Sequence, residues 1–409
     1  MTKVLYVTYN GLTDHIGTAQ VLPYLQSCAE IGHDISVISF EKKSNSSAVR
    51  LLDGELREFG IDWHPLNFYQ PSTALTKLVE TLRLRYTARK ILRANRFDLI
   101  HCRSYVPATT CLSLKKAFKI PLVFDMRGLW ADQRKEGNRW DQRKIIYRFV
   151  YKYWKRQEKA IIRETDEIVS LTKECASEIE SWPEYGGNPI TICPCNVDTS
   201  TFRPILGSQR QRLRKDLGLR PHDPLVVYLG SIGSVYLLKE SIQLFSKIHE
   251  RHPNARFMFI GFHSVDALTN ICREAQVSLP PSVFITKQLG REDVPMFLGA
   301  ADLGLCLIMP SYSSIGVSPT KLGEFLACGL PIIGNTGIGD IENLASTLPQ
   351  LTILANFSDH TMTEVAKAYR VLSDSEREEA ANRAQPLVDI KQVIARYDRI
   401  YRKYEYRHE

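Results

Sequence analysis

The chain has 409 residues, of which 44% are hydrophobic and 24% charged. This composition is typical of an ordinary globular protein, and the length favours two domains over a single core. The first residues, MTKVLYVTYN, lack a long apolar region and a small-residue cleavage site, so they predict a first strand and not a signal peptide. No run approaches the ~18 apolar residues of a membrane-spanning helix. Nine dispersed cysteines favour a reducing, cytoplasmic location.

The net charge of +8 is concentrated in one segment of the chain. Between Arg134 and Arg163, eleven lysines and arginines stand against three acidic residues. This local excess is as large as the net charge of the whole chain, so the remaining sequence is balanced on average. A basic segment in an otherwise neutral protein indicates a local anionic partner.

The first third of the chain alternates short apolar runs with helical patterns, which predicts repeated β-α-β units and a parallel, doubly wound sheet. Strands are expected at 3–8, 34–40, 99–102 and 122–125, and helices at 18–31, 46–59, 74–94 and 108–118. The basic segment reads as a long helix. A strand at 167–171, a helix at 173–181 and a strand at 189–193 follow.

A segment rich in proline and glycine, 183–224, contains the predicted linker between domains. A second set of β-α units follows it, with strands expected at 225–229, 256–260, 283–285, 303–307 and 331–333. Residues 388–406 have the pattern of one long amphipathic helix. The sequence therefore predicts an α/β protein with two doubly wound domains, and ligands bind such sheets beyond the carboxyl ends of their strands. A site in a cleft between the domains is the natural expectation.

Two glycine-containing loops follow first strands and suit the binding of an anion. NGLTDHIGTAQ carries Gly11 and Gly17, with Thr18 as a candidate helix cap, and YLGSIGSVYLLKES carries Gly230 and Ser231. Backbone N–H groups in such loops can bind phosphate oxygens, and Lys239 is a candidate distal cation. Neither loop is a dinucleotide fingerprint or a Walker A motif. Each alone could equally be an ordinary βα turn.

The stretch GVSPTKLGEFLACG reads as a loop entering a helix, with Ser318 at the N-cap and Pro319 as the first helical residue. Lys321 then falls in the first turn, where the helix dipole disfavours a cation. Lys321 and Glu324 project from one face. We interpret the lysine as a counter-charge for a diphosphate and the carboxylate as a ligand for vicinal hydroxyls. The alternative is a surface ion pair between the two side chains.

Several polar residues near strand ends are weaker candidates. In FDMRGLWAD, Arg127 and Asp125 bracket the end of a strand, and a structural ion pair is the alternative to a site role. His101, Arg103 and Asp14 are candidates for the acceptor side of a reaction. For His101, packing inside the protein is the favoured alternative.

Residues 139–163 interleave aromatic and basic side chains. At helical spacing, Ile146, Phe149 with Val150, Tyr153 and Ala160 form an apolar stripe. Such a helix can lie on an anionic membrane surface. The alternative is a core helix with a solvated basic back.

Some chemistries have no sequence signal. There is no D-x-D, no H-x-x-x-H or H-E-x-x-H, no C-x-x-C pair and no G-x-S-x-G elbow. No metal site and no required metal or other cofactor are predicted.

Three segments carry a resemblance to a known family. SPTKLGEFLACGLPII, PCNVDTSTFRP and ADLGLCLIMPS resemble signature segments of the retaining family 4 glycosyltransferases, which have the GT-B fold. In that alignment Glu324 stands at the position that binds the ribose of the nucleotide. RGLWAD resembles a variant found in a branch that builds bacterial surface polysaccharides.

The sequence also departs from the family pattern. Gly316 stands where a first glutamate usually lies near the transferred sugar, Ser231 stands where a phosphate-loop arginine is usual, and Arg127 replaces a histidine. Lys321 and Arg127 are the candidates to replace the lost positive charge. Recognition of the sugar must therefore differ from that in better-known members.

The resemblance implies two Rossmann-like domains facing across a cleft: residues 1–200 on the acceptor side, with the helix at 388–409 packing back on them, and residues 201–387 binding the nucleotide sugar. It implies metal-independent transfer, with retention, of a hexosyl or N-acetylhexosaminyl group from a nucleotide-diphosphate sugar to a glycan or lipid-linked glycan. Arg127 and Lys321 are the catalytic candidates. The donor-binding candidates are Gly17, Gly230, Ser231, Ser318, Thr320, Lys321, Glu324, Gln288 and Leu289, the last two holding the base through their backbone.

Two alternatives remain open from the sequence. A GT-B sugar-nucleotide epimerase would share the fold and the donor, and a nucleic-acid-binding protein would explain the basic helix. The second explains neither the paired glycine loops nor the arrangement of Lys321 and Glu324, so no nucleic-acid partner is predicted. The expected location is cytoplasmic, with peripheral association at the inner face of the plasma membrane.

Overall fold

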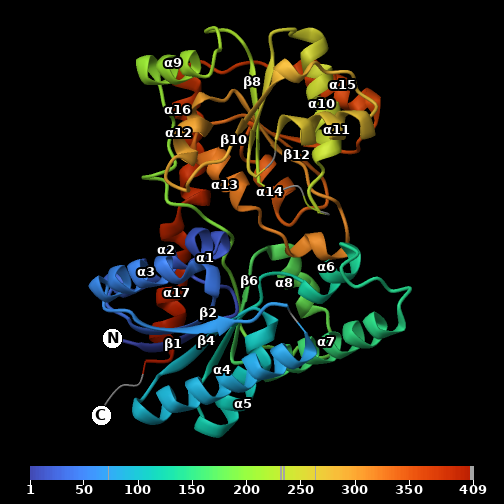
Figure 1. The fold of residues 1–409 in the computed structure, drawn as a ribbon. Helices are drawn as coiled ribbons and strands as arrows, with labels where there is room; N and C mark the ends of the chain where they lie inside the picture. Colours follow the sequence, from blue (N-terminus) through green and yellow to red (C-terminus); the bar gives the residue numbers. More distant parts are fainter. Residues whose placement is uncertain (72, 231–232, 234, 263, 406–409) are drawn as a thin grey trace. The chain divides into compact units, whose positions relative to one another are not determined.

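The computed structural model describes residues 1–71, 73–230, 233, 235–262 and 264–405. It divides into two compact units (Figure 1): unit 1, Met1–Pro194 with Val393–Glu409, and unit 2, Cys195–Gln392. Each unit is a parallel sheet with helices on both faces. The predicted class, two doubly wound Rossmann-like α/β domains, is confirmed.

The sheet of unit 1 is built from β1 (Lys3–Thr8), β2 (Asp34–Lys42), β3 (Asp62–Phe68), β4 (Leu99–Arg103), β5 (Leu122–Asp125), β6 (Glu167–Ser170) and β7 (Ile190–Ile192). In the described residues it has seven strands in the order β3-β2-β1-β4-β5-β6-β7. The central strands are buried along nearly their whole length. This burial on both faces explains why they are continuous apolar runs in the sequence.

The edge strand β3 was not predicted from the sequence. Within β3 only Trp63 is buried, the other residues being exposed or half-buried, and the strand contains Pro65, which cannot donate a ladder hydrogen bond. An edge strand tolerates this because only one of its sides is paired, here with β2. The segment therefore lacks the apolar run by which the interior strands were recognised.

The helices of unit 1 are α1 (His15–Gln20), α2 (Leu22–Glu30), α3 (Ser46–Glu58), α4 (Ala74–Ala94), α5 (Tyr105–Phe118), α6 (Trp130–Glu136), α7 (Ile145–Glu164) and α8 (Lys173–Glu180), with a 3-10 turn η1 (Lys43–Asn45). One helix was expected over 18–31, but the chain forms two, separated at Val21. Helices α4, α5 and α7 lie side by side on one face of the sheet (Figure 1). Helices α1, α2 and α3 lie on the other face.

The C-terminal helix α17 (Ile390–Lys403) packs on unit 1 from Val393 onward. The hydroxyl of Tyr401 lies 2.7 Å from Nδ1 of His101, and Asp398 lies 2.9 Å from Nε2 of His33. One continuous helix from residue 388 was expected. The structure instead ends α16 (Asp374–Val388) before Asp389 and buries Val388 in unit 2.

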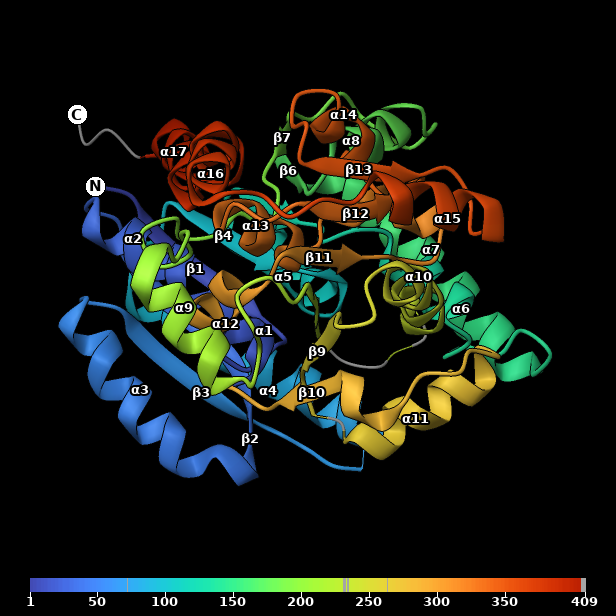
Figure 2. The ribbon, with the colours of Figure 1, turned by 90° about the horizontal axis from the view of Figure 1, so that it is seen from above.

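The sheet of unit 2 contains β8 (Leu225–Leu229), β9 (Arg256–Ile260), β10 (Phe284–Lys287), β11 (Leu303–Cys306), β12 (Ile332–Asn335) and β13 (Leu351–Leu354). In the described residues the strand order is β10-β9-β8-β11-β12-β13. Figure 2 shows β9, β11, β12 and β13 following one another in this order. The edge strand β13 was also missed, because only its two end residues are buried. The carboxyl ends of β8 and β10 carry the residues described below.

The helices of unit 2 are α9 (Gly207–Asp216), α10 (Leu238–Arg251), α11 (Val265–Glu274), α12 (Val294–Ala300), α13 (Thr320–Ala327), α14 (Ile341–Ala345), α15 (Asp359–Ala368) and α16, with 3-10 turns η2 (Pro281–Val283) and η3 (Tyr312–Gly316). Side chains of α12, α13, α14 and α16 form one apolar core with one face of the sheet. Those of α10, α11 and α15 form a second core on the other face.

Residues 195–200, which follow β7, belong to unit 2. The sequence analysis had placed them at the end of the first domain. The N–H of Val197 donates to the carbonyl of Val388 (2.9 Å), and the N–H of Ile390 donates to the carbonyl of Val197 (2.8 Å). Asn196 adds a side-chain bond to the carbonyl of Asp389 (2.8 Å). These bonds fix residues 195–197 to the end of α16, which moves the boundary from residue 200 to residue 194.

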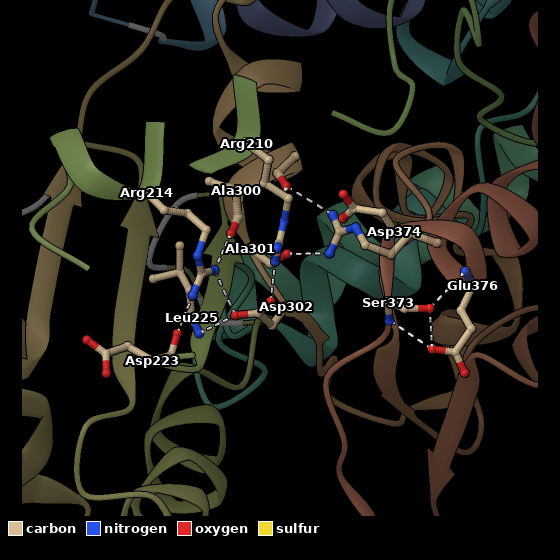
Figure 3. Close-up of polar contacts among 12 residues, drawn as sticks. Arg210, Arg214, Asp223, Leu225, Ala300, Ala301, Asp302, Ser373, Asp374 and Glu376 are labelled. Carbon is tan, nitrogen blue, oxygen red and sulfur yellow. Dashed lines mark hydrogen bonds and ion pairs between the residues drawn. The ribbon is translucent and has the colours of Figure 1, made fainter. Parts of the chain in front are cut away.

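A buried cluster of charged groups ties the helices of unit 2 to its strands (Figure 3). Asp302 accepts from Arg210 and from Arg214 (2.9 Å), both on α9, and from the N–H of Leu225 at the start of β8 (2.8 Å). Arg377 of α16 is fully buried and donates to the carbonyls of Ala301 (2.7 Å) and Gly299 (3.0 Å). Together the arginines bind carbonyls at the end of α12, which a helix leaves without intrahelical partners.

Among the described residues, no helix combines the length and apolar character needed to cross a membrane.

We expect Asp302→Asn to destabilise unit 2 by about 3–5 kcal/mol, because it removes the buried carboxylate that Arg210 and Arg214 share. Urea denaturation followed by circular dichroism measures the effect. The matched control is Glu364→Gln, which removes an exposed carboxylate paired with Lys367 and should leave the midpoint unchanged. Equal midpoints for the two variants would contradict this role of Asp302.

Candidate functional site

The strongest candidate site in unit 2 surrounds Lys321, the second residue of α13. Its ammonium lies 4.6 Å from the ring centroid of Tyr228, at the end of β8, and 4.0 Å from that of Tyr236. Gly230 follows β8 with φ of 132°, and a Cβ placed there would lie 3.4 Å from Nζ of Lys321. The absence of a side chain at Gly230 thus leaves room for the ammonium, and the loop and helix predicted to act together are neighbours.

The ammonium of Lys321 is buried, and none of the residues that the structure describes offers it a hydrogen-bond partner. The residue is 7% exposed. Burial lowers the pKa of Lys321, against the opposing effects of Cys306 and Glu324. A buried cation that has aromatic faces but no hydrogen-bond acceptor is costly to keep charged. Such a group is suited to receive an anionic ligand.

Glu324 does not pair with Lys321, so the alternative of a surface ion pair between them is wrong. Glu324 is 2% exposed and forms an ion pair with Arg291, whose guanidinium lies 4.8 Å from the ring centroid of Phe202. The sequence analysis missed Arg291. Its signal in the sequence was a basic residue four positions after the end of β10, in the segment that leads to α12.

The entrance to α13 differs from the sequence prediction. Pro319 is the N-cap, and the helix begins at Thr320. The hydroxyl of Ser318 accepts a hydrogen bond from the N–H of Cys195 (3.0 Å) and makes no capping bond. Ser318 therefore connects the signature loop to the segment that opens unit 2, and its predicted N-cap role is wrong.

The other donor-side candidates have mixed placements. Gln288 is exposed just beyond β10, and the neighbouring Leu289 packs against the apolar core. Thr320 is half-buried in the first turn of α13. Lys239 is exposed on α10. Ser231 lies outside the described residues.

The glycine loop of unit 1 is occupied by a carboxylate of the protein itself. Glu41, at the carboxyl end of β2, accepts from the N–H groups of Leu12 (2.7 Å) and Thr13 (3.2 Å) and from the hydroxyl of Thr13 (2.6 Å). Two of the donors expected to bind phosphate are therefore engaged internally. Asp14 forms an ion pair with Lys42 (2.8 Å).

Gly17 lies inside α1 and not in the loop before it. A Cβ there would overlap the carbonyl of Gly11 and the backbone of Leu12, so glycine allows the helix to pack closely on the loop. Thr18 was predicted as a helix cap. It lies within α1, and its hydroxyl donates to the carbonyl of Asp14 (3.3 Å).

Arg103, Asp125 and Arg127 meet at the carboxyl ends of the neighbouring strands β4 and β5. Nη1 of Arg127 lies 3.7 Å from Oδ1 of Asp125, and both arginines donate to the side chain of Gln20. Burial works to raise the pKa of Asp125, but Arg127, His101 and Arg103 hold it below its ordinary value. This carboxylate is therefore ionised and partly balances the two cations.

His101 is fully buried between the sheet and α17. Its ring centroid lies 5.2 Å from that of Tyr397, and its Nδ1 contacts the hydroxyl of Tyr401. This burial favours the packing alternative for His101. The acceptor-side roles of His101, Arg103 and Asp14 stay predictions.

The basic segment was expected to form one long helix, but it is divided between the end of α6, a loop and α7, which begins at Ile145. The first half of α7 presents apolar side chains outward. Ile145, Ile146, Phe149 and Tyr153 are exposed, whereas Glu158, Ile161 and Ile162 are buried. Because the exposed stripe lies away from the core, α7 is not a core helix with only a basic outer face.

Two family models match this chain. One, described as Glycosyltransferase Family 4, matches residues 21–201, and the other, described as Glycosyl transferases group 1, matches residues 209–354. Together they span most of the chain.

Among curated proteins, the D-inositol 3-phosphate glycosyltransferase of Nocardia farcinica is 25% identical over 259 residues, which are 61% of this chain and 53% of that protein. The chain spans about half the length of the curated relatives it matches.

Solved structures share the fold over nearly the whole chain. The sucrose-phosphate synthase of Thermosynechococcus elongatus superposes with a TM-score of 0.68 at 14% identity, covering 98% of this chain and 99% of that one. HepE of Anabaena, solved in complex with UDP and glucose, gives a TM-score of 0.69 at 12% identity, covering 98% and 100%. At these identities the likeness shows the GT-B fold alone.

We expect Gly17→Ala to destabilise the protein by several kcal/mol, because the added methyl group would overlap backbone atoms of Gly11 and Leu12. Thermal denaturation measures the change. Gly54→Ala is the matched control, since a Cβ at this position in α3 meets nothing and alanine favours a helix by about 1 kcal/mol. A Gly17 variant as stable as the Gly54 variant would show that the close packing is unimportant.

Proposed function

Because this chain belongs to the family 4 glycosyltransferases with a GT-B fold, we propose that it transfers a sugar, with retention, from a nucleoside diphosphate sugar to a glycan or lipid-linked glycan. The transferred group in this proposal is a hexosyl or N-acetylhexosaminyl residue, and the products belong to polysaccharide or glycoconjugate biosynthesis. The transfer needs no metal ion, because positioned cations of the protein take its place.

One observation carries the proposal: the buried ammonium of Lys321 beside Gly230. Its place at the carboxyl end of β8 is where a doubly wound sheet binds phosphate groups. A diphosphate would supply the hydrogen-bond acceptors that no described residue offers this ammonium. The free energy of pairing a desolvated cation then favours the bound donor.

The rest of the donor has neighbouring partners in unit 2. Glu324 can accept hydrogen bonds from the vicinal hydroxyls of a ribose, and its ion pair with Arg291 orients this carboxylate. The backbone beside Gln288 and Leu289 is proposed to hold the base. UDP is the first donor nucleotide to test, since HepE was solved with it.

In the proposed reaction the bond between the anomeric carbon and the diphosphate breaks as negative charge develops on the leaving oxygen. Lys321 stabilises that charge electrostatically. The acceptor hydroxyl attacks from the face that the diphosphate leaves, and its proton passes to the departing phosphate. Arg127 of unit 1 remains a proposed second catalytic cation, and Arg103 and Asp14 remain proposed acceptor-side residues.

We also propose that the protein binds the cytoplasmic face of an anionic membrane through residues 139–163, as a lipid-linked acceptor would require. The exposed apolar stripe of α7 is accompanied by the outward basic residues Arg148, Lys152 and Arg156. Apolar insertion and attraction to anionic lipid act together in such a helix.

The neighbouring helix α4 has the same character and supports this proposal. Leu75, Leu78, Val79, Leu82 and Tyr86 are exposed on one stripe, and the acidic residue of the helix, Glu80, is fully buried. Helices α4 and α7 both contact α5 on one face of the sheet (Figure 1). The two stripes therefore belong to one layer of unit 1.

We expect Lys321→Met to lower kcat for sugar transfer by about two to three orders of magnitude, because it removes a charge that acts on the leaving diphosphate. Initial rates with UDP-sugars and released UDP as the readout measure this. Lys239→Met is the matched control, since Lys239 is exposed on α10 and should retain activity within about twofold.

The pH profile tests the same role. The protonated lysine binds the diphosphate, and burial lowers its pKa. Wild-type affinity for UDP should therefore fall as the pH rises through a value below that of an ordinary lysine, about 10.4. Rates for Lys321→Met within a few-fold of wild type, or UDP binding that is independent of pH up to 10, would contradict the phosphate role.

We expect Phe149→Ser to weaken binding to vesicles of phosphatidylglycerol and phosphatidylcholine about tenfold, because a side chain 65% exposed in solution would no longer enter the bilayer. Co-sedimentation at low salt measures the bound fraction. Phe262→Ser is the matched control, because Phe262 is 76% exposed and belongs to unit 2, not to the basic helix. Equal sedimentation of wild type and both variants would argue against the membrane surface.

A further inference from the structure

Two guanidinium groups of unit 1 converge on one neutral oxygen. Nη2 of Arg103 donates to Oε1 of Gln20 at 2.9 Å, and Nη2 of Arg127 donates to the same atom at 3.1 Å. The cations come from the ends of adjacent strands, β4 and β5, and Gln20 ends α1. Like charges are thus held within a few ångströms of each other around a single amide oxygen.

The surroundings hold both arginines in this orientation. Arg103 is 4% exposed, and its other terminal nitrogen donates to Oδ1 of Asn10 (3.0 Å), which follows β1. Asp125 lies between the two arginines in the sequence, and its Oδ1 is 3.7 Å from Arg127. The oxygens of Asn10 and Gln20 that accept from these arginines are uncharged.

The backbone at Arg127 is strained. Arg127 has φ of 56°, a left-handed conformation that is unfavourable for a residue with a Cβ. The following residue, Gly128, is fixed because its carbonyl accepts from the hydroxyl of Tyr105 (3.1 Å) and from the N–H of Trp130 (3.0 Å). Strain of this kind is retained where it positions a group for function.

We propose that Arg103 and Arg127 form a binding site for an oxyanion, a phosphate or a carboxylate, and that Oε1 of Gln20 holds the place of its oxygen when no ligand is bound. Oxyanions bind guanidinium groups through charge-assisted hydrogen bonds that are about twice as strong as those to a neutral amide. The half-buried Gln20 can therefore be displaced by a ligand that brings a negative charge. The alternative is that the arginines only pair with Asp125 and Gln20 to support the fold.

The oxyanion has two chemical sources, the diphosphate of a sugar nucleotide or an acidic group on the acceptor. This choice of sources rests on the proposed glycosyl transfer, whereas the existence of the site does not. The second source would mean that the enzyme acts on an acidic glycan or on a phosphorylated acceptor.

The test measures the melting temperature of the full-length protein with increasing sodium phosphate. All variants carry Lys321→Met, so that the lysine of unit 2 does not contribute to the response. Gln20→Glu places a carboxylate between the arginines without changing the shape of the side chain. Gln20→Ala removes the amide oxygen and is the matched control.

We expect phosphate to raise the melting temperature of K321M and of its Gln20→Ala derivative. The Gln20→Glu derivative should melt higher without ligand and should need at least tenfold more phosphate for any further rise. A K321M protein that does not respond to phosphate, or a Gln20→Glu derivative that responds like its parent, overturns the site.

Two further ligands identify the source of the oxyanion. A response of K321M to UDP that Gln20→Glu removes assigns the site to the donor. A response to glucuronate but not to glucose, again removed by Gln20→Glu, assigns it to an acidic acceptor. Sugar transfer by the wild type is assayed separately, so its absence would refute the proposed function without affecting the phosphate result.

Discussion

The carboxylate of Asp302 connects the amino ends of the two central strands of unit 2. It directly precedes β11, binds the first N–H of β8 and accepts from Arg210 and Arg214 on α9. Arg377 extends the cluster to α16. Because the amino ends are fixed in this way, the opposite ends of the same strands are rigid supports for a site. Gly230 and the tyrosine rings around Lys321 depend on that support.

At the carboxyl edge of its sheet, unit 2 contains a cation that does not stabilise the unliganded protein. The ammonium of Lys321 is desolvated above two tyrosine rings, in a helical turn where the dipole also disfavours a cation. Glu324, one turn further on, is taken by Arg291 and does not neutralise it. The arrangement destabilises the unliganded state and so increases the differential affinity for an anion. In the proposed reaction that anion is the diphosphate.

At the carboxyl edge of the sheet in unit 1, oxygens of the protein itself accept hydrogen bonds from the loop N–H groups and from the arginines. The carboxylate of Glu41 accepts from the loop N–H groups that the sequence suggested for phosphate, and the amide of Gln20 lies between Arg103 and Arg127. The two cases differ in how easily a ligand could enter. The carboxylate of Glu41 is buried and accepts from several donors, whereas the amide of Gln20 is half-buried.

The sequence by itself determined the interior strands, the two-domain α/β class and the neighbourhood of Gly230 and Lys321, because buried parallel strands are apolar runs and glycine marks close backbone approach. It did not reveal the edge strands β3 and β13, whose exposed positions break the apolar pattern. Only the tertiary structure decided the partners: Arg291 for Glu324, Glu41 for the glycine loop and Gln20 for the arginine pair. These pairs join residues 29 to 107 positions apart. Local periodicity carries no information about such contacts, which arise when the folded sheets bring distant loops to one edge.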